Sequence, residues 1–64
     1  MMNNLKIFRD KKGITQKVLA EKADLSIRSY QRYETGERTP NTFLAQKLAL
    51  LLETTVSELF PLND

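Results

Sequence analysis

The chain has 64 residues, enough for one small domain and no more. It contains neither cysteine nor histidine, which excludes disulfides, thiolate metal sites and an imidazole general base. No stretch approaches the roughly 18 apolar residues of a membrane span, and the N-terminus lacks the apolar run of a signal peptide. We expect a single domain over residues 1–64, with its core at 5–60, in the cytoplasm and without metal or cofactor.

Charge is distributed unevenly along the chain, although the net charge is only +2. Residues 1–40 carry nine Lys and Arg against five Asp and Glu, whereas residues 41–64 carry one against three. This asymmetry indicates a basic functional end, with a different task for the acidic or neutral end. The alternative is a chance distribution over a solvated surface.

The pattern predicts an all-α fold of five short helices, without strands or repeats. The first helix is expected at residues 5–12, with Asn3 and Asn4 as candidate N-caps. Gly13 can end it in the left-handed conformation. The second helix is expected at residues 16–23.

Each later helix follows a residue that can accept a hydrogen bond from the first turn. These candidate N-caps are Thr15, Ser26, Asn41 and Thr55. The third helix would end at Gly36, the fourth would cover residues 42–53, and a short fifth would stop before Pro61. Thr55 and Glu58 have the spacing of a capping box.

The third helix has two different faces. Tyr30 and Tyr33 lie at i, i+3 spacing on one side, which we expect to be buried. The other side is basic and polar, and it carries Ile27, Arg28, Gln31 and Arg32. These four residue types match the contacts that an α-helix makes with base edges in the DNA major groove.

Each of these side chains can contact a particular chemical group on a base edge. Arg28 and Arg32 can donate two hydrogen bonds to guanine, Gln31 can address adenine or span two bases, and Ile27 can contact a thymine methyl. The alternative for the arginines is an ordinary solvated face. The alternative for Ile27 is packing against Leu25.

Further residues on either side of this helix could bind the DNA backbone. The candidate phosphate contacts are Gln16, Lys17, Arg38 and Asn41. Gln16 and Lys17 begin the second helix, where backbone N–H groups and the helix dipole favour an anion. Lys17 is unfavourable for that dipole, which suits a docking anion, although an ordinary exposed lysine is the alternative.

No catalytic arrangement is present in the sequence. The serines and threonines have no histidine to activate them, and no glycine-rich phosphate loop or metal-ligand spacing occurs. The chain is therefore not expected to be an enzyme.

The order and spacing of several residues resemble the Cro/CI-type helix-turn-helix family, also called the XRE family. The matching residues are Thr15-Gln16-x-x-Leu19-Ala20, Leu25-Ser26, Tyr33-Glu34-x-Gly36-x-Arg38-x-Pro40 and Leu59-Phe60. The resemblance implies a compact five-helix lambda-repressor-like domain, with the helix-turn-helix at about residues 15–35. Members of this family are bacterial and phage transcriptional regulators that commonly bind operators as dimers.

The resemblance also implies roles for single residues. It places Ile27, Arg28 and Arg32 at base-reading positions of the third helix and Gln16 at a phosphate contact. It makes Arg9 and Glu34 a structural salt bridge between the first and third helices.

In two turns the chain departs from the family pattern, because Asp24 and Glu53 stand where many relatives have glycine. We expect strain in both turns, with Asp24 the better suited to a left-handed conformation.

The fourth helix has more apolar residues than one buried stripe needs. The surplus, with two residues that follow it, is a candidate dimer surface made of Phe43, Leu44, Leu50, Leu51, Val56 and Leu62. The alternative is that a small domain uses all of these residues in its own core.

These observations predict a sequence-specific DNA-binding regulator, specifically a repressor that binds double-stranded DNA through the major groove as a homodimer on a palindromic operator. Two alternatives remain. One is the antitoxin of a toxin–antitoxin pair, with the same DNA face and the fourth helix against the toxin. The other is a protein-interaction module without DNA binding.

Overall fold

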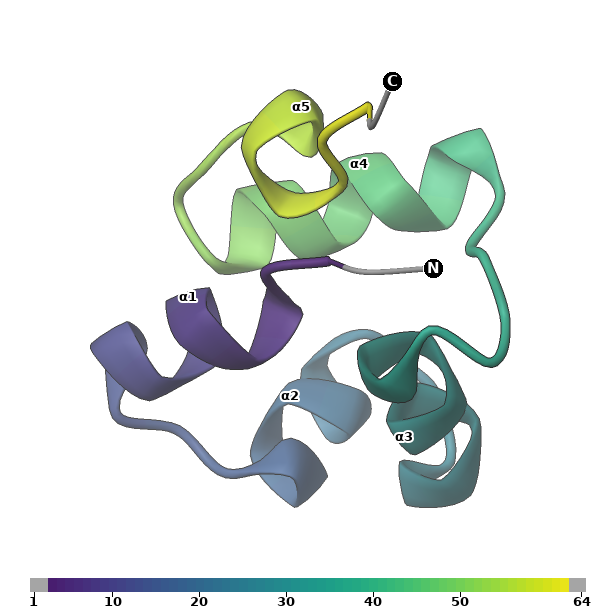
Figure 1. Cartoon of the computed structure of the whole chain (residues 1–64). Helices are drawn as coiled ribbons and strands as arrows, with labels where there is room; N and C mark the ends of the chain where they lie inside the picture. Colours follow the sequence, from purple (N-terminus) through teal and green to yellow (C-terminus); the bar gives the residue numbers. More distant parts are fainter. Residues whose placement is uncertain (1–2, 63–64) are drawn as a thin grey trace.

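The computed structural model describes residues 3–62, which form five helices and no strand. The helices are α1 (Leu5–Lys12), α2 (Gln16–Lys22), α3 (Ile27–Thr35), α4 (Thr42–Leu51) and α5 (Val56–Leu59). The predicted all-α fold is confirmed. In Figure 1, α2 and α3 form one end of the molecule, α4 and α5 form the other, and α1 lies between them.

One hydrophobic core joins all five helices. Every helix contributes one large side chain that is fully buried: Leu5, Leu19, Tyr30, Leu48 and Leu59. Small alanines fill the space between them, so the helices approach closely. Because no helix buries its apolar face alone, the position of each depends on the others.

The predicted caps of the later helices are present. The side chains of Thr15, Ser26, Asn41 and Thr55 accept hydrogen bonds from the backbone N–H groups of Val18, Ser29, Leu44 and Glu58, respectively. Gly13 and Gly36 end α1 and α3 in the left-handed conformation. The capping box is altered, because the Glu58 carboxylate accepts from the Thr54 and Thr55 hydroxyls.

The start of α1 differs from the prediction. Asn4 is its N-cap residue but makes no side-chain capping bond, and Asn3 Oδ1 accepts instead from the Leu5 N–H. The two asparagine amides donate elsewhere, Asn3 to the Tyr33 carbonyl and Asn4 to the Glu58 carbonyl, each at 2.8 Å. These asparagines therefore tie the beginning of α1 to α3 and α5.

Asp24 and Glu53 both adopt left-handed backbone conformations, with φ of 61° and 55°. These are the two positions where the resemblance pointed to glycine and strained turns. In each turn the following N–H still closes the end of a helix, from Leu25 to Ala20 and from Thr54 to Ala49. Glu53 also forms an ion pair with Lys12 at the end of α1.

Fewer apolar side chains of α4 are exposed than the sequence predicted. Leu44 and Leu51, which we expected on a dimer surface, are half-buried and pack against the core. Phe43 and Leu50 are 74% and 78% exposed, so these two residues of the expected dimer surface do lie in solvent. The burial of Leu44 and Leu51 shows that more than one stripe of α4 is covered by the rest of the domain. In the described part of the chain, no helix has the length and hydropathy needed to cross a membrane.

The cap of α4 gives a direct test of this architecture. Replacing Asn41 with Ala should lower the free energy of unfolding by about 0.5–2 kcal/mol, because the Leu44 N–H loses its acceptor. Thermal unfolding should show a lower midpoint for Asn41→Ala and a nearly unchanged one for Asn41→Ser, which keeps an acceptor. Equal loss in both variants would contradict the capping role.

Candidate nucleic-acid interface

The turn that follows α2 positions α3 so that one face lies against the core and the other faces solvent. The Leu25 N–H donates to the Ala20 carbonyl at 2.8 Å, which closes α2, and Ser26 caps α3. On α3, Tyr30 is fully buried. The opposite face carries the four predicted base contacts, of which Ile27, Arg28 and Gln31 are exposed and Arg32 is half-exposed.

Three of these four side chains share one surface feature. Arg28, Gln31 and Arg32 line an open hollow together with Thr35 and Glu37. Ile27 is 44% exposed and does not line it. The structure therefore groups the two arginines and the glutamine and sets Ile27 apart from them.

A carboxylate that was not expected from the sequence also lies at this surface. Glu37 Oε2 lies 3.5 Å from Arg32 Nε, just beyond the end of α3. The signal in the sequence was weak, because Gly36 changes the chain direction and helical spacing no longer applies after it. An exposed pair of this kind contributes only about 0–1 kcal/mol, so it leaves Arg32 able to exchange partners.

The predicted phosphate contacts occupy different settings. Lys17 is exposed in the first turn of α2. Arg38 lies in the loop after α3, where its guanidinium is 6.0 Å from the centre of the Tyr33 ring. Its backbone N–H donates to the Arg32 carbonyl, which folds this loop against the end of α3. The Asn41 side-chain oxygen is used as a cap, so only its amide nitrogen is free to donate to a phosphate.

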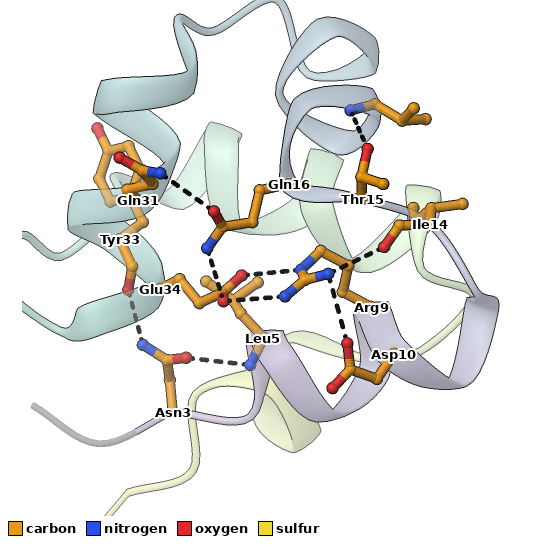
Figure 2. A network of polar contacts seen from close by, with 11 residues as sticks. Asn3, Leu5, Arg9, Asp10, Ile14, Thr15, Gln16, Gln31, Tyr33 and Glu34 are labelled. Atoms are coloured by element: carbon orange, nitrogen blue, oxygen red, sulfur yellow. Dashed lines mark hydrogen bonds and ion pairs between the residues drawn. The ribbon is translucent and has the colours of Figure 1, made fainter.

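Beneath this face, Arg9 and Glu34 form a buried ion pair between α1 and α3. Arg9 Nε donates to Glu34 Oε2 at 3.0 Å, and Arg9 Nη2 donates to Glu34 Oε1 at 3.2 Å. Arg9 Nη1 donates to the Ile14 carbonyl, in the turn before α2. The side chains are only 11% and 8% exposed. One guanidinium thus joins α1, α3 and the α1–α2 turn, as Figure 2 shows.

The surroundings keep the Glu34 carboxylate ionised. Burial alone would raise its pKa, but the hydrogen bonds from Arg9 and Gln16, the nearby Tyr30 hydroxyl and the positive charge of Arg9 together outweigh burial, so the pKa is lowered. Burial and Glu34 raise the pKa of Tyr30, which stays neutral. Among residues 3–62, the Tyr30 hydroxyl is the buried side-chain polar atom without a hydrogen-bond partner.

Two glutamines connect this ion pair to the exposed face of α3. Gln16 Nε2 donates to Glu34 Oε1 at 3.0 Å, and Gln31 Nε2 donates to Gln16 Oε1 at 3.1 Å (Figure 2). From the sequence, Gln16 was expected at a phosphate and Gln31 at the bases, and their mutual contact was not expected. Only the relative rotation of α2 and α3 brings them together.

Comparison with known proteins agrees with this arrangement. A family model described as helix-turn-helix matches residues 5–59, which is most of the chain. That family is the XRE or Cro/CI type. A search of curated proteins gave no match.

The buried ion pair predicts a strong effect of truncation. Replacing Arg9 with Ala should cost about 3–5 kcal/mol, because the Glu34 charge remains buried without its partner. A chain of 64 residues has a total stability of about 3–10 kcal/mol, so this loss removes between about a third and all of the free energy of unfolding. Replacing both Arg9 and Glu34 with Met should recover much of the loss. Circular dichroism during urea unfolding measures both.

The lowered pKa of Glu34 predicts the pH dependence of stability. Its stabilising contribution should be complete above the ordinary carboxyl value of 4.5 and should be lost as the pH falls through the lower value of the folded protein. In the Arg9→Met/Glu34→Met variant, the slope of stability against pH below 4.5 should be smaller. The same slope in both proteins would show that other carboxylates dominate.

Proposed function

The chain belongs to the XRE, or Cro/CI-type, helix-turn-helix family of DNA-binding regulatory domains, and from this premise we propose that it is a transcriptional repressor that binds a palindromic operator as a homodimer. The observation that carries the proposal is the exposed face of α3. There, Arg28, Gln31 and Arg32 line one hollow while Tyr30 fixes the opposite face in the core.

This face suits the major groove of DNA. The groove admits one α-helix, and each arginine can donate a pair of hydrogen bonds to guanine O6 and N7. Because Arg32 is held by Glu37 only through an exposed ion pair, it can turn to a base at low cost. Glu37 would then lie beside the DNA, where its negative charge disfavours close approach of a phosphate.

Phosphate contacts on both sides would orient α3 in the groove. Lys17 and the N-terminal turn of α2 supply one side, and Arg38 with the Asn41 amide supplies the other. Such contacts give affinity and register without reading sequence. Ile27, at the first position of α3, would contact a thymine methyl.

We assign the homodimer contact to the exposed apolar residues of α4 and the segment after it. Phe43 and Leu50 are seven residues apart on α4 and both are more than 70% exposed. Val56 and Leu62 are also exposed and would extend this surface, in the part of the chain with few basic residues. A second copy would bury it symmetrically and set two α3 helices about 34–36 Å apart, one turn of DNA.

A repressor of this kind needs no enzymatic step. Occupying an operator excludes competing proteins from the same DNA, and the cytoplasm of a bacterial cell is where that DNA lies.

The experiment that tests the proposal is selection of bound duplexes from a random library. An enriched site with two inverted half-sites supports it, whereas recovery of unselected sequences at low salt contradicts it.

Two substitutions should separate base reading from phosphate binding. Arg32→Ala should cost about 1–3 kcal/mol on the selected site and relax the preference at one base position. Lys17→Ala should weaken all sequences alike and reduce the dependence of affinity on salt. Titrations of selected and scrambled duplexes at several salt concentrations measure both. If Arg32→Ala weakens both duplexes equally, Arg32 contacts only phosphate.

The dimer contact can be tested without DNA. Leu50→Glu places a charge on the proposed apolar surface and should convert the dimer to a monomer in sedimentation equilibrium at micromolar concentration. Gln46→Glu, on an exposed position of the same helix, is the matched control and should leave the dimer intact. A wild-type chain that is monomeric at high micromolar concentration would contradict the assignment.

A further inference from the structure

The hydrogen bond between Gln16 and Gln31 has a defined direction, because Gln31 donates and Gln16 accepts. Three side chains form what we term the glutamine bridge: Glu34, Gln16 and Gln31, in the order from the core to the surface of α3. At one end is a buried carboxylate whose other donors come from Arg9. At the other end is a side chain that lines the candidate base-reading hollow.

The carboxylate determines how the Gln16 amide is oriented. Ionised Glu34 can only accept hydrogen bonds, so Gln16 must turn its NH₂ group toward Glu34 Oε1, 3.0 Å away. This leaves Gln16 Oε1, an acceptor, to face α3. The alternative orientation would place two oxygens against each other beside a buried charge, which is strongly unfavourable.

The same reasoning fixes Gln31. Since Gln16 presents an acceptor, Gln31 must present its NH₂ group, at 3.1 Å. One of the two hydrogens on Gln31 Nε2 is then used by Gln16. What Gln31 still offers is one N–H donor and its Oε1 acceptor, in a fixed orientation.

We infer that the glutamine bridge makes Gln31 a reader of adenine, with Gln16 as the positioning residue that sets the direction of its amide. Adenine presents an N7 acceptor beside an N6 donor in the major groove, which matches one donor and one acceptor. Guanine presents two acceptors there, and cytosine and thymine present only one polar group each. An unsupported glutamine could rotate and span two bases, whereas the bridge removes that freedom.

Gln16 keeps a second amide hydrogen, so a phosphate contact remains compatible with this role. The two roles differ in their consequences. Phosphate binding by Gln16 affects all DNA sequences equally, whereas positioning of Gln31 affects only the base that Gln31 reads. The inference rests on the proposed function for its DNA partner, but the bridge itself exists in the free protein.

The test compares Gln16→Met, Gln31→Ala and the double variant by selection from a random duplex library. Met keeps the length of Gln without its hydrogen bonds, and Gln46→Met on α4 is the matched control. The position read by Gln31 is the one whose adenine preference disappears in Gln31→Ala. Gln16→Met should reduce that preference by about 5-fold or more, and the double variant should lose no more than Gln31→Ala alone. Unchanged adenine preference in Gln16→Met, an equal loss on all sequences, or a base other than adenine overturns the inference.

A measurement without DNA separates this inference from the proposed function. The side-chain NH₂ resonances of Gln31 in ¹⁵N-correlated NMR spectra should shift in Gln16→Met and stay unchanged in Gln46→Met. If no site is enriched but the Gln31 resonances shift, the bridge exists and the proposed function fails. If a site is enriched but the resonances do not respond to Gln16→Met, the bridge is overturned and the proposed function stands.

Discussion

The ion pair between Arg9 and Glu34 is the interaction on which the rest of this small domain depends. It joins α1 to α3, and through the Ile14 carbonyl it also holds the turn before α2. A buried charge pair is rarely a large net source of stability, but the loss of one partner is costly. Its effect here is therefore on geometry, because an orientation of α3 that separated Glu34 from Arg9 would leave a buried charge unpaired. The exposed face of α3 takes its direction from that requirement.

The hydrophobic core acts together with this pair. Each helix buries one large side chain, so no element is stable on its own, and the short helices are held by side-chain caps and left-handed ends. Two of the left-handed positions are Asp24 and Glu53 and not glycine. The domain tolerates this local strain because the helices on both sides are fixed by the core.

Much of the fold could be predicted from sequence, because caps, left-handed glycines and helical spacing are local signals. Thr15, Ser26, Asn41 and Thr55 all cap as predicted. The basic face of α3 could also be predicted from spacing alone. The contact of Gln16 with Gln31 and the pairing of Arg32 with Glu37 could not, because each depends on how separate segments meet in space. The inward position of Leu44 and Leu51 escaped prediction because a single helical stripe underestimates how much of α4 is covered.

The central claim is that one surface, made of the exposed side of α3 with its flanks at α2 and the loop before α4, meets duplex DNA. It is tested most directly by titrating the ¹⁵N-labelled chain with duplex DNA at low salt and following backbone amide resonances. The account predicts that the largest changes fall on residues 16–18, 27–35 and 37–41, with little change at Phe43 and Leu50. Changes confined to α4 and α5, or no changes at all, would contradict it.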